Sequence, residues 1–183
     1  MAEVSSPAAY FTHMIPQQYA AAMESAPAGV VDQPPLIAVF EITGAGGDVF
    51  SLRSAGKQIE VQPGEQIEDP DMRVVMSFDD WRALAESGAT DIFVDYVERG
   101  KVAVVKSLKG TVHLELTRSD GSLWHSTIVF NGQAEPALTV MMSNDDYRAM
   151  LSGELNSQMA FLTGKLTFEG SLPLLMQIGA LAS

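Results

Sequence analysis

Cysteine is absent from this sequence of 183 residues, and basic residues are scarce. Without a thiol the chain has no disulfide, thiolate metal ligand or cysteine nucleophile, and it suits a reducing compartment. Eleven Lys and Arg stand against 23 Asp and Glu, which gives a net charge of −12. Binding to a phosphate backbone requires clustered cations, so nucleic acid is not an expected partner. The same charge limits contact with anionic membranes to a transient one.

Long apolar runs are also absent, since no stretch reaches the roughly 18 to 20 residues of a membrane span. Residues Met1 to Ala9 lack the basic region and apolar run of a secretory signal. The final Leu181-Ala182-Ser183 is not the peroxisomal Ser-Lys-Leu signal. We therefore expect a cytoplasmic protein.

The composition is that of a globular chain. Hydrophobic residues make up 46 % of it and charged residues 19 %, which is enough for a sizeable core. Residues 1–35 are predicted to form an N-terminal helix, interrupted at Pro16, and a Pro-rich linker. The remainder divides into residues 36–110 and residues 111–183, and we expect residues 36–183 to form one compact unit.

Short strand patterns with interspersed helices follow the linker. Thr111 to Thr117 alternates between apolar and polar residues, which indicates a sheet with one wet face. The Asp120-Gly121 turn predicts a hairpin that returns along Leu123 to Phe130. Further strands are expected at 36–43, 49–54, 58–61, 73–77, 101–106, 138–143 and 165–169, and helices at 78–87, 145–151 and 172–182. This order favours an α+β fold, with a mostly antiparallel sheet and helices on one face.

A strand-to-helix segment occurs twice in the chain. Residues 74–84 and 140–150 share Val, Met, Ser, Asp, Asp, Arg and Ala at equivalent places, and Trp81 matches Tyr147. In each copy a strand is expected to end at a serine, Ser77 or Ser143, whose hydroxyl can cap the next helix. We infer two related half-units that share one structure.

Several motifs of residues 111–183 occur in a characteristic order. They are the hairpin Leu123 to Gly132, Asp146-Tyr147 on a helix, Gly153, the segment Asn156 to Ala160, and Gly164-Lys165-Leu166 followed by Gly170. This combination resembles the sterol carrier protein 2 family. Residues 36–110 resemble that family more loosely and lack a terminal helix of their own.

The resemblance implies both a fold and a function. The fold would be a five-stranded curved sheet covered by helices, with an apolar tunnel between the two layers. The function would be non-catalytic binding, and transfer, of a hydrophobic lipid such as a sterol, a fatty acid, an acyl-CoA ester or an isoprenoid. No cofactor is implied.

The second half of the chain supplies the apolar lining that a lipid tunnel needs. Methionine is unbranched and adapts to ligands of variable shape, and the chain contains ten. An ordinary filled core is the competing interpretation of the same residues. The candidate lipid-binding residues are Met142, Tyr147, Met150, Leu151, Met159, Phe161, Leu162, Phe168, Leu172, Leu175, Met176 and Ile178.

Two other functions stay open at this point. With a filled core, the chain would be a non-catalytic interaction or scaffold module that partners a lipid- or steroid-processing enzyme. The apolar helix 172–182 would then contact that enzyme, or a second copy of the chain. A small-molecule enzyme that uses His113 or His125 is the third reading. No histidine has the spacing of a metal-ligand pair, so we predict no metal site and no catalytic residue.

Overall fold

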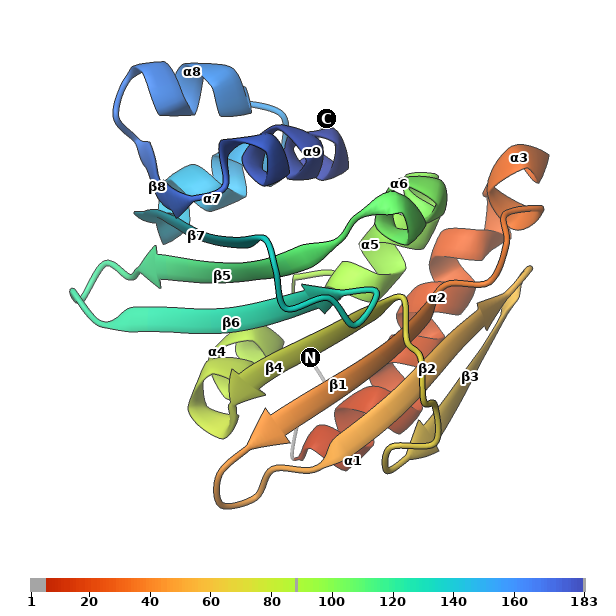
Figure 1. Ribbon diagram of the computed structural model, residues 1–183. Coiled ribbons are helices and arrows are strands. Elements are labelled where there is room, and N and C mark those ends of the chain that lie inside the picture. Colours follow the sequence, from red (N-terminus) through yellow and green to blue (C-terminus); the bar gives the residue numbers. More distant parts are fainter. Residues whose placement is uncertain (1–5, 88, 183) are drawn as a thin grey trace.

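A computed structural model describes residues 6–87 and 89–182 of the chain (Figure 1). Within these residues one eight-stranded sheet has the order β3-β2-β1-β4-β6-β5-β7-β8. Its strands are β1 (Ile37–Thr43), β2 (Val49–Ala55), β3 (Gln58–Pro63), β4 (Met72–Ser77), β5 (Gly110–Thr117), β6 (Leu123–Phe130), β7 (Ala137–Ser143) and β8 (Leu166–Gly170).

Most neighbouring strands are antiparallel, and only the pairs β1–β4 and β5–β7 run parallel within the described sheet. The predicted α+β class with a mostly antiparallel sheet is confirmed. The five strands implied by the family resemblance are wrong for this chain. Residues 37–77 contribute four strands, and the β4–β6 pairing joins them to the other four in a single sheet.

The helices lie before, between and after these strands in the sequence (Figure 1). They are α1 (Pro7–Ala9), the π-helical turn η1 (Tyr10–Met14), α2 (Ile15–Glu24), α3 (Ala28–Val31), α4 (Phe78–Glu86), α5 (Ile92–Glu98), α6 (Val102–Ser107), α7 (Asn144–Leu151), α8 (Ser157–Leu162) and α9 (Leu172–Ala182).

Several segments differ from the sequence prediction. Residues 102–107 form helix α6 and not a strand, with Val102 and Val105 buried one helical turn apart. Helix α3 lies inside the expected linker, and α5 and α8 were not predicted. The N-terminal helix continues past Pro16 because its preceding turn widens. Ile15 N–H bonds to Tyr10 O, which relieves the clash of a proline ring with the carbonyl four residues before it.

The two halves of the chain share one local topology. β1 pairs antiparallel with β2 and parallel with β4, as β5 does with β6 and β7. Thr43 lies opposite Ser77, and Thr117 lies opposite Ser143. Each serine Oγ accepts a hydrogen bond from the amide three residues later, at 3.1 Å and 3.0 Å. The predicted helix caps are confirmed, whereas a common origin of the halves stays a prediction.

One face of the sheet carries the apolar side chains from edge to edge. In register across the strands, Phe40 pairs with Val74, Val74 with Ile128, Ile128 with Val112, and Val112 with Leu138. Residues that pair in register point to the same face of a sheet. The buried sides of both halves are therefore one continuous surface.

The N-terminal helix fills the space over the first half of this surface. The Phe11 ring stacks on Phe50 with centroids 4.5 Å apart and lies 5.1 Å from Phe40. The Tyr19 hydroxyl donates a hydrogen bond to Gly56 O at 2.7 Å, which fixes α2 to the turn between β2 and β3. The core over β1 and β2 is consequently packed with aromatic rings.

The opposite face of β5 and β6 is polar, as the alternation predicts. His113 Nδ1 lies 3.0 Å from Thr127 Oγ1, and His125 Nε2 lies 3.9 Å from Glu115 Oε1. The register places His113 opposite Thr127 and His125 opposite Glu115. Neither histidine is on the apolar side of the sheet.

Candidate functional site

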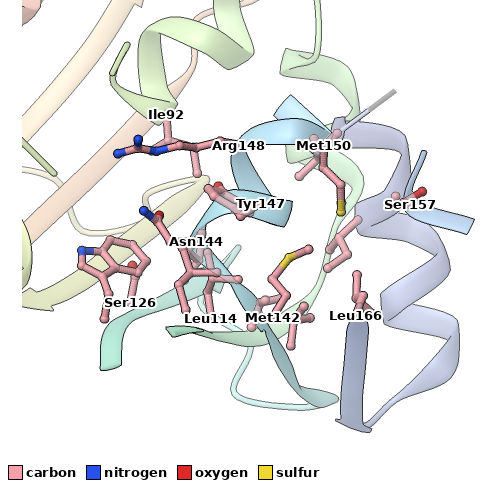
Figure 2. A pocket seen from close by; sticks show the side chains of 18 of the residues that line it. Ile92, Leu114, Ser126, Met142, Asn144, Tyr147, Arg148, Met150, Ser157 and Leu166 are labelled. Atoms are coloured by element: carbon pink, nitrogen blue, oxygen red, sulfur yellow. The ribbon is translucent and has the colours of Figure 1, made fainter. Parts of the chain in front are cut away.

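A cavity of about 1020 Å³ lies over the second half of the apolar sheet face (Figure 2). This volume is at the upper end of the range of about 300–1,000 Å³ found for small-molecule sites. Five strands form its floor, through side chains that include Val74, Val112, Leu114, Ile128, Val140 and Leu166. The cavity therefore begins where the aromatic filling of the first half ends.

Helices from both halves of the chain form the walls. Ile92 and Tyr96 come from α5 and Leu84 comes from α4, while Tyr147 and Met150 come from α7. The register of β4 with β6 brings the first-half helices to this side of the sheet. The cavity is thus not confined to residues 111–183, where the sequence predicted the tunnel.

Helices α8 and α9 border the cavity on its solvent side. Leu162 and Met176 are each 71 % exposed, and Leu172 is 52 % exposed, although all three line the cavity. Side chains that border a cavity and also face water mark its opening. The buried Leu174, 1 % exposed, fixes α9 to the rest of the protein.

The structure brings together most of the residues proposed from the sequence as a lipid site. Met159 is 52 % exposed and does not border the cavity. Phe168 does not border it either, but its ring lies 5.7 Å from that of Phe161. The Leu151 side chain lies outside the described part of the structure. The proposed residues that do line the cavity are Met142, Tyr147, Met150, Phe161, Leu162, Leu172, Leu175, Met176 and Ile178.

Sequence reasoning missed the first-half wall and, apart from Met142, most of the floor. The alternation in residues 111–117 places Val112, Leu114 and Leu116 on one side of the strand. These floor residues of β5 could therefore have been predicted from the sequence. No sequence pattern indicated that α4 and α5 border the cavity. Their position depends on the pairing of β4 with β6, two strands that are more than 50 residues apart in the sequence. Trp124, Asn144 and Arg148, three of the polar residues of the lining, were also missed.

Three charged side chains line the cavity within the described residues. Arg118 Nη2 lies 3.0 Å from Asp80 Oδ1, and Asp95 Oδ2 lies 3.4 Å from Arg99 Nη1. Burial, together with the charge of Asp95, raises the pKa of Tyr147 to about 12. The Tyr147 phenol is therefore neutral at physiological pH and available as a hydrogen-bond donor.

The described residues contain no cluster of three or more His, Asp or Glu side chains that could hold a metal ion. Among the helices that the structure describes, none has the length and apolar character needed to cross a membrane. The geometry that stands out is the open apolar cavity with a few polar groups at its border.

Comparisons with known proteins find a family and several proteins to which parts of this chain are similar. Residues 96–183 match the model of the SCP-2 sterol transfer family. Over 68 residues the chain is 35 % identical to "Peroxisomal multifunctional enzyme A" of Dictyostelium discoideum, and over 83 residues it is 31 % identical to "Hydroxysteroid dehydrogenase-like protein 2" of Bos taurus. These matches cover 37 % and 41 % of this chain but only 14 % and 20 % of the two relatives.

A solved structure is also similar in part. The sterol carrier protein domain 2 of Helicoverpa armigera is 23 % identical, with a TM-score of 0.39. The match covers 48 % of this chain and 77 % of that chain.

Proposed function

Because residues 96–183 of this chain match the model of the SCP-2 sterol transfer family, we propose that the protein binds a hydrophobic lipid in its cavity. The lipid would be held without chemical change and handed on, as a carrier does. The observation that supports this proposal best is the cavity of about 1020 Å³ over an apolar sheet face. Side chains of the second half do not fill that space, whereas Phe11 and its neighbours fill the equivalent space of the first half.

The energetics favour an acyl chain or a ring system as the occupant. Burial of one CH₂ group contributes about 0.8 kcal/mol, so a chain of a dozen such groups contributes about 10 kcal/mol before the costs of association. The floor residues Val112, Leu114 and Val140 offer apolar contact along three adjacent positions of the sheet. Affinity would come from this area and not from any one polar contact.

A role beside an enzyme is the second candidate. The two relatives named above carry enzyme names and are far longer than this chain. The apolar residues Leu162, Leu172 and Met176 lie exposed at the mouth of the cavity, where a partner would meet the lipid. In this form of the proposal the chain presents lipid to a separate enzyme. The alternative of a filled core is not supported, since the cavity is open.

The test is whether a bulky side chain on the cavity floor removes lipid binding. Leu114→Trp places an indole in the cavity, whereas Leu123→Trp makes the same change at a residue that is 51 % exposed and outside the lining. We expect a fluorescent fatty acyl probe to bind wild type and Leu123→Trp equally, and Leu114→Trp at least tenfold more weakly. Native mass spectrometry would identify lipid retained from the host.

Equal probe binding by both variants would place the lipid elsewhere and contradict the cavity proposal. Failure of the wild type to bind any acyl, sterol or isoprenoid probe would contradict the carrier function as a whole. Circular dichroism of both variants separates loss of the site from loss of the fold.

A further inference from the structure

Arg148 differs from the other charged residues of the cavity. Arg118 is paired with Asp80, and Asp95 is paired with Arg99. Arg148 borders the same cavity, and no ion pair or side-chain hydrogen bond engages its guanidinium within the described residues. The charges within each ion pair cancel, so the guanidinium of Arg148 is the one uncompensated charge of the described lining. It is positive, although the protein as a whole has a net charge of −12.

A second polar group accompanies this guanidinium. Asn144 and Arg148 are four residues apart on α7, and residues at this spacing lie on the same helix face. In Figure 2 the side-chain nitrogens of both residues are at the same side of the pocket, opposite the side where Met150 and Leu166 lie. The Asn144 amide has no hydrogen-bond partner in the part of the chain that the structure describes.

Tyr147 adds a third donor at this place. It lines the cavity between Asn144 and Arg148 in the sequence, and its hydroxyl makes no hydrogen bond among the described residues. Asn144, Tyr147 and Arg148 together offer amide, phenol and guanidinium donors at one end of an apolar cavity. A guanidinium binds carboxylate and phosphate oxygens through paired N–H groups, a geometry that a neutral hydroxyl does not exploit.

We propose that Arg148, with Asn144 beside it, selects lipids that have an anionic head group, a carboxylate or a phosphate, over neutral lipids with the same hydrocarbon part. The hydrocarbon part would lie on the sheet floor toward Met150, and the head group would remain at the water-exposed guanidinium. This inference rests on the proposed lipid-binding function and assigns the determinant of its specificity.

The test compares three ligands with the same hydrocarbon chain: dodecanoate, dodecyl phosphate and dodecanol. Arg148→Gln removes the charge, and Arg148→Lys keeps it. Arg82→Gln is the matched control, because it removes one exposed positive charge outside the cavity lining, where Arg82 lies over the Phe78 ring. Affinities are measured by displacement of a neutral fluorescent lipid at neutral pH.

We expect wild type and Arg82→Gln to prefer an anionic ligand over dodecanol by about tenfold or more. Arg148→Gln should lose that preference while its affinity for dodecanol is unchanged, and Arg148→Lys should retain part of it. A preference for only one of the two anions supports the proposal and identifies the head group. Raising the salt concentration should weaken binding of the anions only, because the guanidinium is exposed.

The result that overturns the proposal is an unchanged preference in Arg148→Gln, or no preference in wild type. Either result leaves lipid binding itself intact, since dodecanol would still bind. If instead no ligand binds to wild type, the proposed function fails and not merely its specificity. Binding of dodecanol by Arg148→Gln also shows that this variant is folded.

Discussion

The Tyr10 hydroxyl donates a hydrogen bond to Asp91 Oδ2 at 3.2 Å and so joins two buried residues that are 81 positions apart in the sequence. Asp91 also caps helix α5, because its Oδ1 accepts the Phe93 N–H at 2.9 Å. Helix α5 forms part of the cavity wall through Ile92 and Tyr96. The N-terminal helix therefore supports the cavity through this bond although it does not border it.

This carboxyl makes stability depend on pH. Burial raises the pKa of Asp91 to about 6, against the opposing hydrogen bonds of Phe93 and Tyr10. The folded protein then holds the proton more tightly than the unfolded chain, whose carboxyl has the ordinary value of 3.8. The resulting stabilisation is complete at acidic pH and is lost as the pH rises through about 6.

The substitution Asp91→Asn should remove this dependence, because the amide is neutral throughout and can still cap the helix. We expect the unfolding free energy of wild type, relative to the variant, to fall by on the order of 2 kcal/mol from about pH 4 to about pH 7. Urea unfolding of both proteins at the two pH values measures this difference in unfolding free energy. The other titrating groups are common to both proteins, so their contributions cancel. A difference that stays constant would show that Asp91 is ionised in the folded protein at both pH values.

The two serine caps provide a second prediction. Ser77 and Ser143 each accept the first-turn amide of the helix that follows, so Ser77→Ala and Ser143→Ala should each cost about 1 kcal/mol of unfolding free energy. The double variant should be additive within about 0.5 kcal/mol, because the caps share no partner. Ser107→Ala is the control, since that exposed hydroxyl donates to Val104 O in the last turn of α6. Chemical unfolding that shows no loss for either cap would contradict the prediction.

The features that the sequence predicted correctly are local ones. The strand Leu123–Phe130 and the helix Leu172–Ala182 have the predicted bounds, and the serine caps occur where the repeat placed them. Each depends on side chains within a few residues of one another, through alternation, turn chemistry or capping. The apolar second half was also enough to indicate most of the cavity lining in residues 142–178.

The features that the sequence did not predict depend on distant contacts. Residues 101–106 read as a strand because Val-rich segments favour strands, but burial of Val102 and Val105 on one side selected a helix. The eight-stranded sheet needs the β4–β6 pairing, which no local pattern encodes. No pattern in the sequence distinguishes Arg148 from other charged helix residues, and only its place in the lining of the cavity does so.

A third prediction concerns the start of β5. Gly110 has φ +118°, and a Cβ there would collide with Pro136 O and meet Leu174 Cδ2 at 3.0 Å. Gly100 also has a positive φ, of +73°, but its Cβ would meet nothing within 4 Å. Gly100→Ala should therefore cost only the backbone strain, about 1 kcal/mol, and Gly110→Ala at least about 2 kcal/mol more. Equal losses in thermal or urea unfolding would contradict the close approach of Pro136 and Leu174 to Gly110.

The last prediction uses the two tryptophans as reporters of ligand binding. Trp124 lines the cavity, and its Nε1 donates to Asp80 O at 2.9 Å. Trp81 is 2 % exposed, packs 5.3 Å from the Phe78 ring and is not part of the lining. A lipid that enters the cavity makes the surroundings of the Trp124 indole less polar, so its emission should shift to shorter wavelength.

In Trp81→Phe the shift should persist with the same ligand dependence. In Trp124→Phe the shift should be lost, although native mass spectrometry still detects bound lipid. This pair of variants separates binding in the cavity from binding at the exposed apolar surface of α8 and α9, because neither tryptophan lies on those helices. A shift that survives in Trp124→Phe would mean that the ligand acts on the packed core around Trp81. The lipid would then bind over the first half of the sheet, where Phe11 now fills the space.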